Sequence, residues 1–480
     1  MPYRFRWVFC QLDALRHCFP QNLRRFLNEL PESLDETYER ILKSISKTRK
    51  DDARRLLHCL AAAVRPLRVE ELAELLAFDF QASTSGGIPK LKEDWRWDNQ
   101  EEAVLSTCSS LITIVHNGDS RVVQFSHFSV KEYLTSPRLA QSHGDVSRFH
   151  IVLGAAHTIM AQACLGTLLR LDEHASNSVE GSPLVGYAAE HWVDHAQFEN
   201  VSSSVRDGMD DLFDTSKPHF AAWLQVHDID EAWTFFTLRG QAKVVGSPLY
   251  YAAFCGFYDL AERLIMKHPE QVNSGSGRNL APLPAALYKR HFRVANLLFN
   301  RGAVVDARAE DEGTLLHSAS AYGYLDIMQW LLSHGADANA QDKNPWTPLH
   351  LAASNTRPEA VQMLLEHNAD VNLQNAEGDT PLYMAVSEVS DSPQEAGKAI
   401  DMVRRLLEHG ADTNTGRRHS TPLHRASTDG SLEVVRLLLS YGAIVDAMDG
   451  EGRTPFEAAS SSGHHEIAKL LLEHGAVPQT

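Results

Sequence analysis

The stretch FSHFSVKEYL at 125–134 gathers side chains of the kinds that hydrolytic enzymes use. It holds His127, Ser129, Lys131 and Glu132, which offer a base, a hydroxyl nucleophile, a cation and a carboxylate. A serine nucleophile needs an adjacent base and a free hydroxyl. The G-x-S-x-G turn that presents such a serine in α/β-hydrolases is absent here.

A helix start accounts for the same residues without catalysis. Ser129 precedes an expected helix and Glu132 follows three positions later, which is the spacing of a capping box. Phe128 and Tyr133 are spaced to form the accompanying hydrophobic staple. We therefore predict that Ser129 caps a helix and that His127 makes a structural hydrogen bond at a strand-to-helix corner.

Two further sets of histidines raise the question of a metal site. His191 and His195 are four residues apart and share an expected helix face, but Trp192 stands where H-E-x-x-H has its glutamate. A packed helix with polar edges is the prediction. His317, His350 and His424 each occupy the same place in a repeated unit, so repeat stacking explains their spacing. No metal and no cofactor is predicted.

Phosphate binding by a P-loop requires glycines that lead into Gly-Lys-Ser/Thr. The chain has one Gly-Lys pair, Gly397-Lys398, and Ala399 follows it without the earlier glycine. The sequence therefore predicts no nucleotide site in this chain.

The composition of the chain limits the classes of partner and the cellular locations that we expect. The 480 residues carry a net charge of -17, which argues against binding to nucleic acid or to anionic membranes. No apolar run approaches the roughly 18–20 residues of a membrane span. The six cysteines are scattered without a C-x-x-C pair, as in a reducing compartment. We expect a cytoplasmic protein, with a nuclear location left open.

The second half of the sequence is a repeat. Units begin at Ser247, Ala281, Thr314, Thr347, Thr380, Thr421 and Thr454, at spacings of 34, 33, 33, 33, 41 and 33 residues. In the unit TPLHLAASNTRPEAVQMLLEHNADVN at 347–372, the threonine suits a helix N-cap and the proline the first helical turn. A glycine such as Gly335 or Gly410 suits the residue after the second helix.

These units resemble the ankyrin repeat over 247–480, with the first two units degenerate. The resemblance implies a stack of helix pairs in which the repeated histidines bond to neighbouring units. It also implies that a partner binds on the concave face. Asn368 replaces the terminal glycine in one unit. About eight extra residues near EVSDSPQEAG are expected to form a surface loop between two helices.

The first half reads as helices followed by a β-hairpin. Ser33 and Glu36 fit a capping box before a helix with Tyr38 and Leu42 on its apolar side. RPLRVEELAELLAFDF at 65–80 predicts a short helix with a strand-like tail. The stretch 101–136 predicts helix, strand, turn, strand and helix, with HNGDS as the turn. This order is typical of a winged helix.

Three motifs carry a wider resemblance. RPLRVEELAELLA, FSHFSVKEYLTS and YAAEHW, followed by ankyrin-like units, resemble fungal NACHT–ankyrin proteins, which are nucleotide-switched receptors of the NLR-like type. The 65–136 portion resembles their winged-helix module, also found beside GPI inositol-deacylase-like domains. FRWVFCQLDALRHC resembles the last helix after the nucleotide-binding core. Since that core is missing, we expect either a natural truncated relative or an upstream segment not included in this sequence.

The predicted fold class is mainly α, with a helical and winged-helix N-terminal region followed by an ankyrin-repeat α-solenoid. The predicted domains are a helical segment at 1–64, a winged-helix-like domain at 65–140, a helical linker domain at 141–246 and seven ankyrin units at 247–480.

The predicted function is a non-enzymatic scaffold or adaptor that recognises a protein partner, with no nucleic-acid, membrane or small-molecule ligand. One alternative is the regulatory half of a STAND-type NTPase. Another alternative is a DNA-binding winged helix, but the excess of acidic over basic residues argues against it. The candidate partner-binding residues lie before the unit's threonine or late in the first helix: Tyr322, Lys343, Asn344, Trp346, Ser354, Asn355, Glu377, Asp379, Arg417, Arg418, Thr428 and Asp429.

Overall fold

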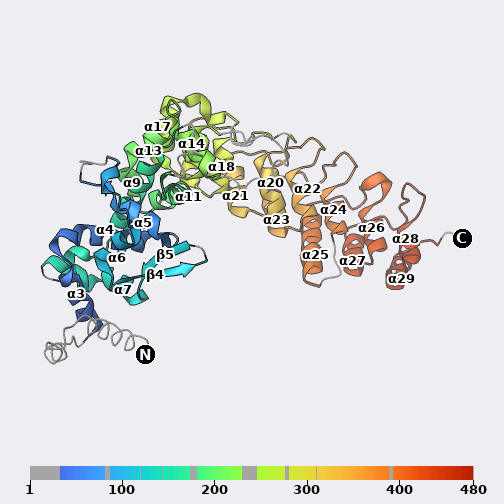
Figure 1. Ribbon diagram of the computed structural model, residues 1–480. Coiled ribbons are helices and arrows are strands. Elements are labelled where there is room, and N and C mark those ends of the chain that lie inside the picture. The colour runs from blue at the N-terminus through green and yellow to red at the C-terminus, as the bar shows by residue number, and fades with distance from the viewer. Residues whose placement is uncertain are drawn as a thin grey trace. The chain divides into compact units, whose positions relative to one another are not determined.

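The structure is a computed structural model that describes residues 33–81, 87–118, 120–142, 144–172, 181–229, 246–275, 281–309, 311–388 and 393–478. The chain forms two compact units, Met1–Pro248 with Cys255–Lys267, and Leu249–Phe254 with His268–Thr480. Both are built mainly from helices (Figure 1). The predicted helix over FRWVFCQLDALRHC lies outside the described residues.

Among the described residues, the first helices of the first unit are α3 (Leu34–Ser44) and α4 (Lys50–Ala62). Ser33 caps α3 as predicted, because its hydroxyl accepts the backbone N–H of Glu36 at 3.2 Å. Tyr38 and Leu42 are buried on the side of α3 that the apolar spacing predicted.

A small antiparallel sheet follows. Its strand order is β1 (Leu67–Arg68), β5 (Ser120–Phe125), β4 (Ile112–Asn117), so the hairpin of β4 and β5 pairs back to the start of this region. Val123 lies opposite both Leu67 and Ile114. Helices α5 (Val69–Leu76) and α6 (Gln100–Cys108) pack together beside the sheet. The order predicted over 101–136 is confirmed.

A second, two-stranded sheet pairs β2 (Phe78–Asp79) with β3 (Lys90–Leu91). β2 is the strand-like tail that the sequence predicted after α5. The other α-helices described in the first unit surround a core that includes Trp192 and Trp223, whose rings meet edge to face at 5.3 Å. They are α7 (Phe128–Leu134), α8 (Pro137–Gln141), α9 (Leu153–Leu168), α11 (Val185–Ala196), α12 (Val201–Ser204), α13 (Arg206–Leu212), α14 (His219–Val226) and α17 (Tyr258–Lys267).

The repeated units start where the sequence placed them. Residues Ala281, Thr314, Thr347, Thr380, Thr421 and Thr454 are each the N-cap of a first helix. The first helices are α16 (Pro248–Phe254), α18 (Pro282–Tyr288), α20 (Leu315–Tyr322), α22 (Pro348–Ser354), α24 (Pro381–Ser387), α26 (Pro422–Asp429) and α28 (Pro455–Ser461). The second helices from the second unit onward are α19 (Phe292–Asn300), α21 (Leu325–Ser333), α23 (Pro358–Glu366), α25 (Pro393–Glu408), α27 (Leu432–Ser440) and α29 (His465–Glu473).

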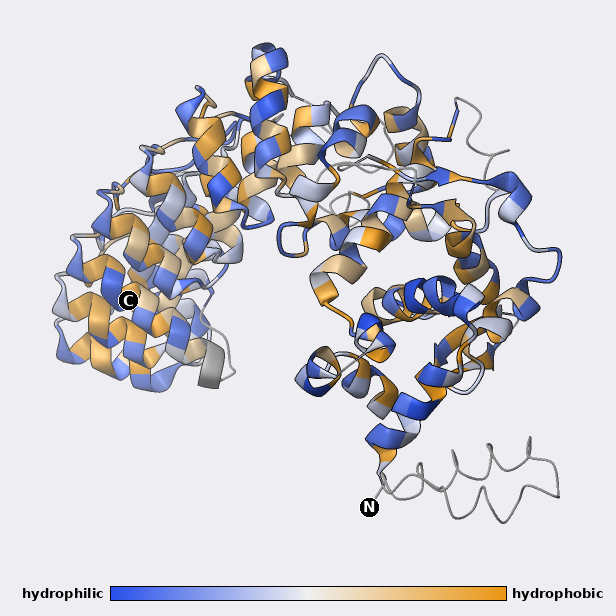
Figure 2. Ribbon diagram, turned by 90° about the vertical axis from the view of Figure 1, so that its left-hand side faces the viewer, coloured by the Kyte–Doolittle hydropathy of each residue, from blue (hydrophilic) through white to orange (hydrophobic). Residues whose placement is uncertain are grey.

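From α20 onward the first helices form one row and the second helices another (Figure 1). Hydrophobic and hydrophilic residues alternate along these helices (Figure 2), so that each can pack on its neighbours and still face water. Leu349 and Ala352 of α22 and Val361 and Leu364 of α23 are fully buried and form the core of that unit.

The turn after each second helix needs a left-handed residue. Gly335 and Gly410 have φ of 88° and 85°, and Asn368 takes the same conformation with φ of 61°. The terminal positions predicted from the sequence are therefore confirmed. Asparagine is among the few residues with a side chain that adopt this conformation readily.

The expected loop at EVSDSPQEAG is wrong in part. α25 begins at Pro393 and has 16 residues, whereas α23 has 9. Much of the insertion thus lengthens the second helix at its N-terminal end. Gln394, Glu395 and Ala396 have good helix propensity, which favours this outcome over a loop.

Cys59, Cys108, Cys164 and Cys255 are buried free thiols. Burial raises the pKa of Cys59 and of Cys108 to about 12, so neither is ionised near neutral pH. None of the helices within the described ranges is both long and apolar enough to cross a membrane.

Candidate functional site

The cluster of polar residues at 125–134 is built differently from the prediction. α7 begins at Phe128, and its N-cap is His127, whose Nδ1 accepts the backbone N–H of Ser129 at 3.3 Å. Ser129 is therefore inside the first turn, and the prediction that it caps the helix is wrong. The predicted staple is also wrong, because Phe128 is 51% exposed while Tyr133 packs on Tyr38.

The Ser129 hydroxyl is enclosed and shared between two partners. It lies 2.6 Å from His127 Nδ1 and 2.8 Å from the hydroxyl of Tyr38 on α3, and its residue is 4% exposed. A substrate carbonyl would have to displace Tyr38 to reach it. The geometry joins α3 to α7, which agrees with the structural role that we predicted for this stretch.

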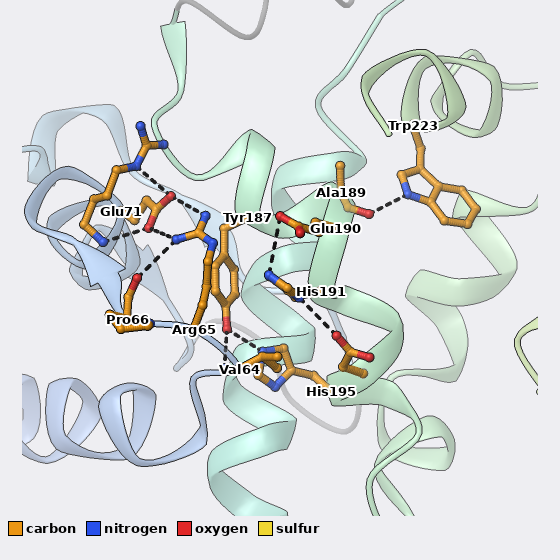
Figure 3. Close-up of polar contacts among 12 residues, drawn as sticks. Val64, Arg65, Pro66, Glu71, Tyr187, Ala189, Glu190, His191, His195 and Trp223 are labelled. Carbon is orange, nitrogen blue, oxygen red and sulfur yellow. Dashed lines mark hydrogen bonds and ion pairs between the residues drawn. The ribbon is translucent and has the colours of Figure 1, made fainter. Parts of the chain in front are cut away.

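A second polar network links the start of β1 to α11 (Figure 3). Glu71, which is fully buried, accepts two hydrogen bonds from the Arg65 guanidinium at 2.9 and 2.8 Å and one from the Arg68 backbone N–H. Burial alone would raise the pKa of Glu71, but these bonds outweigh it and hold that pKa below its usual value. The guanidinium of Arg65 also lies over the ring of Tyr187, 4.8 Å from its centre.

The Tyr187 hydroxyl continues this network into the helices. It accepts the Val64 backbone N–H at 3.1 Å and lies 2.9 Å from His195 Nε2. His195 Nδ1 in turn lies 2.9 Å from His157 Nδ1 on α9. Burial lowers the pKa of His195 to about 3, so its ring is neutral and spans the two partners. Sequence reasoning missed His157, because its partner lies 38 residues away.

His191 and His195 do not act together. His191 Nδ1 bonds Asp194 at 3.0 Å, whereas His195 is fully buried against Tyr187 and His157. Among the residues that the structure describes, no three His, Cys, Asp or Glu side chains are grouped so as to hold a metal ion. Gly397 and Lys398 lie within the helix α25, so this Gly-Lys pair does not form a phosphate-binding loop.

The repeated histidines tie each unit to the next. Nδ1 of His317, His350 and His424 accepts the backbone N–H of the threonine that caps its own helix. The opposite Nε2–H donates to the carbonyl of Trp346, Asp379 or Arg453, at 3.1, 3.0 and 2.9 Å, always 29 residues later. Burial lowers the pKa of all three histidines. The expected hydrogen bond to neighbouring repeats is confirmed.

A second ladder of bonds was not predicted. An Asn or Asp after each second helix accepts a backbone N–H of the following unit, as when Asn339 Oδ1 accepts from Asp370 at 2.7 Å. The same bond joins Val304 to Asn273, Asp337 to Asp306, Asp412 to Asn372, Ile444 to Asn414 and Val477 to Asp446. The Asn or Asp that recurs after the second helices was the signal available in the sequence.

The candidate partner-binding residues fall into exposed and enclosed groups. Those with exposed side chains are Tyr322, Lys343, Asn344, Asn355, Glu377, Arg417, Thr428 and Asp429. Ser354 is half-buried, and its hydroxyl donates to the Leu351 carbonyl. The side chain of Arg418 lies outside the described residues.

Three candidates have internal roles that the sequence did not reveal. Asp379 is 1% exposed, so the expectation that it is free for a partner is wrong; Asn375 anchors its carboxylate and its backbone N–H. Arg417 pairs with Glu377 and reaches Asp379 Oδ1 at 3.2 Å. Trp346 is half-buried with its ring 6.0 Å from that of His350, and its carbonyl accepts from His317.

The helix pairs and the hairpin with its flanking helices define a protein of the ankyrin-repeat class that also carries a winged-helix domain. A family model of ankyrin repeats in three copies matches residues 316–417 and 394–480, and one of many copies matches 283–332. A third family model, described as the winged helix domain of GPI inositol-deacylase, matches residues 38–146. The predicted fold class is confirmed, and the match begins within α3, earlier than the predicted boundary at 65.

Parts of the chain are similar in sequence to curated proteins. The "Azaphilone pigments biosynthesis cluster protein L" of Monascus ruber is 33% identical over 298 residues, which cover 58% of this chain and 61% of that protein. "Ankyrin repeat and SOCS box protein 16" of Homo sapiens is 34% identical over 228 residues, covering 46% and 50%. "Potassium channel AKT1" of Oryza sativa subsp. indica is 40% identical over 55 residues, covering 11% and 6%. The chain thus spans less than two thirds of the length of these relatives.

Proposed function

We propose that this protein is a non-enzymatic scaffold that holds a protein partner on the concave face of its ankyrin repeats. One observation carries the proposal. In the third, fourth and sixth units the threonine, histidine and alanine positions are buried, while Tyr322, Asn355 and Thr428, near the C-terminal ends of the first helices, are exposed. Exposed side chains on successive first helices offer a surface that a partner could recognise.

The setting that we propose is NLR-like signalling, with the scaffold acting in the cytoplasm. The winged-helix match and the ankyrin match stand in the order that the resemblance to NACHT–ankyrin proteins implies. In this proposal the domains are the helical segment 1–64, the winged helix 65–140, the helical linker 141–246 and the repeats 247–480. Nucleic acid, membranes and small molecules are not its ligands.

The test compares two faces of the array. Asn355→Arg with Thr428→Arg places two bulky cations at the ends of first helices, both at exposed positions. Glu366→Arg with Glu473→Arg places the same groups at exposed positions on second helices. Crosslinked proteins captured from an extract of the source organism by the full chain should be lost with the first pair only. Equal capture by both variants would overturn the concave-face assignment.

A further inference from the structure

Three tyrosines meet at the corners between first and second helices in the second and third ankyrin units. The rings of Tyr322 and Tyr324 are stacked with centres 5.6 Å apart. The ring of Tyr288 meets Tyr324 edge-on at 6.0 Å. Tyr322 is 43% exposed, so the cluster reaches the surface.

Cations border these rings. The Arg290 guanidinium lies 5.6 Å from the centre of Tyr324 and also pairs with Asp326 at 2.6 Å. Lys289 is exposed, with its Nζ 4.4 Å from the centre of Phe254. Arg357 of the next unit donates to the Ala321 carbonyl at 3.2 Å, beside Tyr322. Arg290 and Arg357 thus lie beside the tyrosines, Lys289 follows Tyr288 directly in the chain, and the Asp326 carboxylate pairs with Arg290.

Later units place different residues at the same positions. The last two residues before the corner are Tyr288 and Lys289 in the second unit, but Ser354 and Asn355 in the fourth. In the fifth they are Ser387 and Glu388, and in the sixth Thr428 and Asp429. The fold therefore accepts small, polar or acidic residues here. Tyr288, Lys289 and Tyr322 thus occupy positions at which the fourth, fifth and sixth units have neither an aromatic ring nor a cation.

We propose that an acidic linear segment of the partner protein binds to one surface of the repeats, which we call the tyrosine–cation corner. This surface consists of Tyr288, Lys289, Arg290, Tyr322 and Tyr324. Carboxylates of the segment would pair with Lys289 and Arg290, and its apolar or planar groups would lie on the tyrosine rings. Tyrosine and arginine are enriched among the residues that dominate binding energy at interfaces. This inference rests on the proposed function and names the chemistry of the partner.

Charge complementarity selects a short acidic peptide over a nucleic acid. The whole chain carries a net charge of -17, so a long polyphosphate would be repelled by most of the surface. A short acidic segment meets only the local cations. Its binding should weaken as salt rises, because Lys289 and Arg290 are at the surface.

The experiment measures binding of the full chain to fluorescein-labelled acidic peptides. Peptides with Asn and Gln in place of Asp and Glu, and a single-stranded oligonucleotide, serve as comparison probes. The test variant is Lys289→Ser with Tyr322→Ser. The matched control is Tyr441→Ser with Lys469→Ser, because Tyr441 is 44% exposed, as Tyr322 is, and the Lys469 side chain is 79% exposed.

We expect the test variant to bind acidic peptides at least about tenfold more weakly, with the control variant unchanged. Equal binding of the amide peptides, tighter binding of the oligonucleotide, equal weakening in both variants, or no acidic binding would each overturn the inference. If proteins captured by the first-helix face are identified and the acidic peptides still fail, the proposed function stands and only this inference falls.

Discussion

The Ser129 hydroxyl lies 2.8 Å from the hydroxyl of Tyr38, a residue 91 positions earlier in the chain. Both side chains are buried, at 4% and 1% exposure. This contact explains why a serine flanked by histidine, lysine and glutamate is not presented to a substrate. It also holds the start of α7 against α3. Because the two residues are 91 positions apart in the chain, no local sequence pattern reveals this contact.

Ser129→Ala should lower the free energy of unfolding by about 1–3 kcal/mol, because a buried hydrogen bond to Tyr38 is lost. A double-mutant cycle with Tyr38→Phe, measured by urea denaturation, separates this bond from other effects. The two substitutions should be non-additive. Strict additivity would mean that the two hydroxyls do not stabilise each other.

His127→Ala should cost about 0.5–2 kcal/mol, since His127 and not Ser129 caps α7. His127→Asn is the conservative comparison, because asparagine is a good N-cap residue and should recover most of the loss. The measurement is again the denaturation midpoint. Equal destabilisation by alanine and asparagine would count against the cap.

Gly335→Val should destabilise the protein by about 1–2 kcal/mol, because φ at Gly335 is 88° and a β-branched residue is strained there. The control is Gly397→Val, inside α25, where a Cβ meets nothing within 4 Å. There the change should stay within about 0.5 kcal/mol, since valine has a higher helix propensity than glycine. A similar loss at both sites would show that the backbone of Gly335 is not the cause.

Acid should destabilise the first unit through His195. Its pKa in the folded protein is about 3, below the ordinary value near 6.5, so the unfolded chain binds the proton more readily. The stabilising contribution is complete above about pH 6.5 and is lost as the pH falls toward 3, by up to about 1.4 kcal/mol per pH unit. The free energy of unfolding of wild type and of His195→Gln, compared at several pH values, tests this. The same slope in both proteins would contradict it.

Arg417→Ala should reduce stability by about 1 kcal/mol, a modest figure because the Arg417 side chain is 44% exposed. The loss arises because Asp379, buried beside it, would remain without that cation. Asp379→Asn in the same chain removes the buried charge and should restore the melting temperature. If Arg417→Ala alone leaves the melting temperature unchanged, Arg417 is free for the partner, as the sequence suggested.

The boundaries of the repeats were predictable because their signals are local. A threonine before a helix, a proline in its first turn and a glycine after the second helix each act within a few residues. Thr347 and Gly335 therefore stand where the sequence placed them. The pairing of β4 with β5 was predictable for the same reason, because the HNGDS turn that joins the two strands is also a local signal.

Several of the errors have the opposite cause, which is contact with residues far away in the chain. The Ser129 hydroxyl bonds Tyr38, 91 positions earlier, and the buried Asp379 contacts Arg417 of the following unit. His157 escaped notice for the same reason. The insertion forms helix because its own residues favour helix and because it extends the second helix of its unit. Extending a helix that already exists is easier than starting a new one.

The ladder of Asn and Asp bonds has a practical consequence for protein engineering. Most of its bonds join residues 31 positions apart, yet Asp412 still reaches Asn372 across 40 positions, at 2.8 Å. The unit that holds α25 thus gained length without losing its register to its neighbours. The N-terminal end of a second helix is therefore the place to splice a reporter peptide or an affinity tag into this array. The same addition between Asn339 and Thr347 would lengthen the hairpin connection that leads to the His350 bond, and we expect it to disturb the stack.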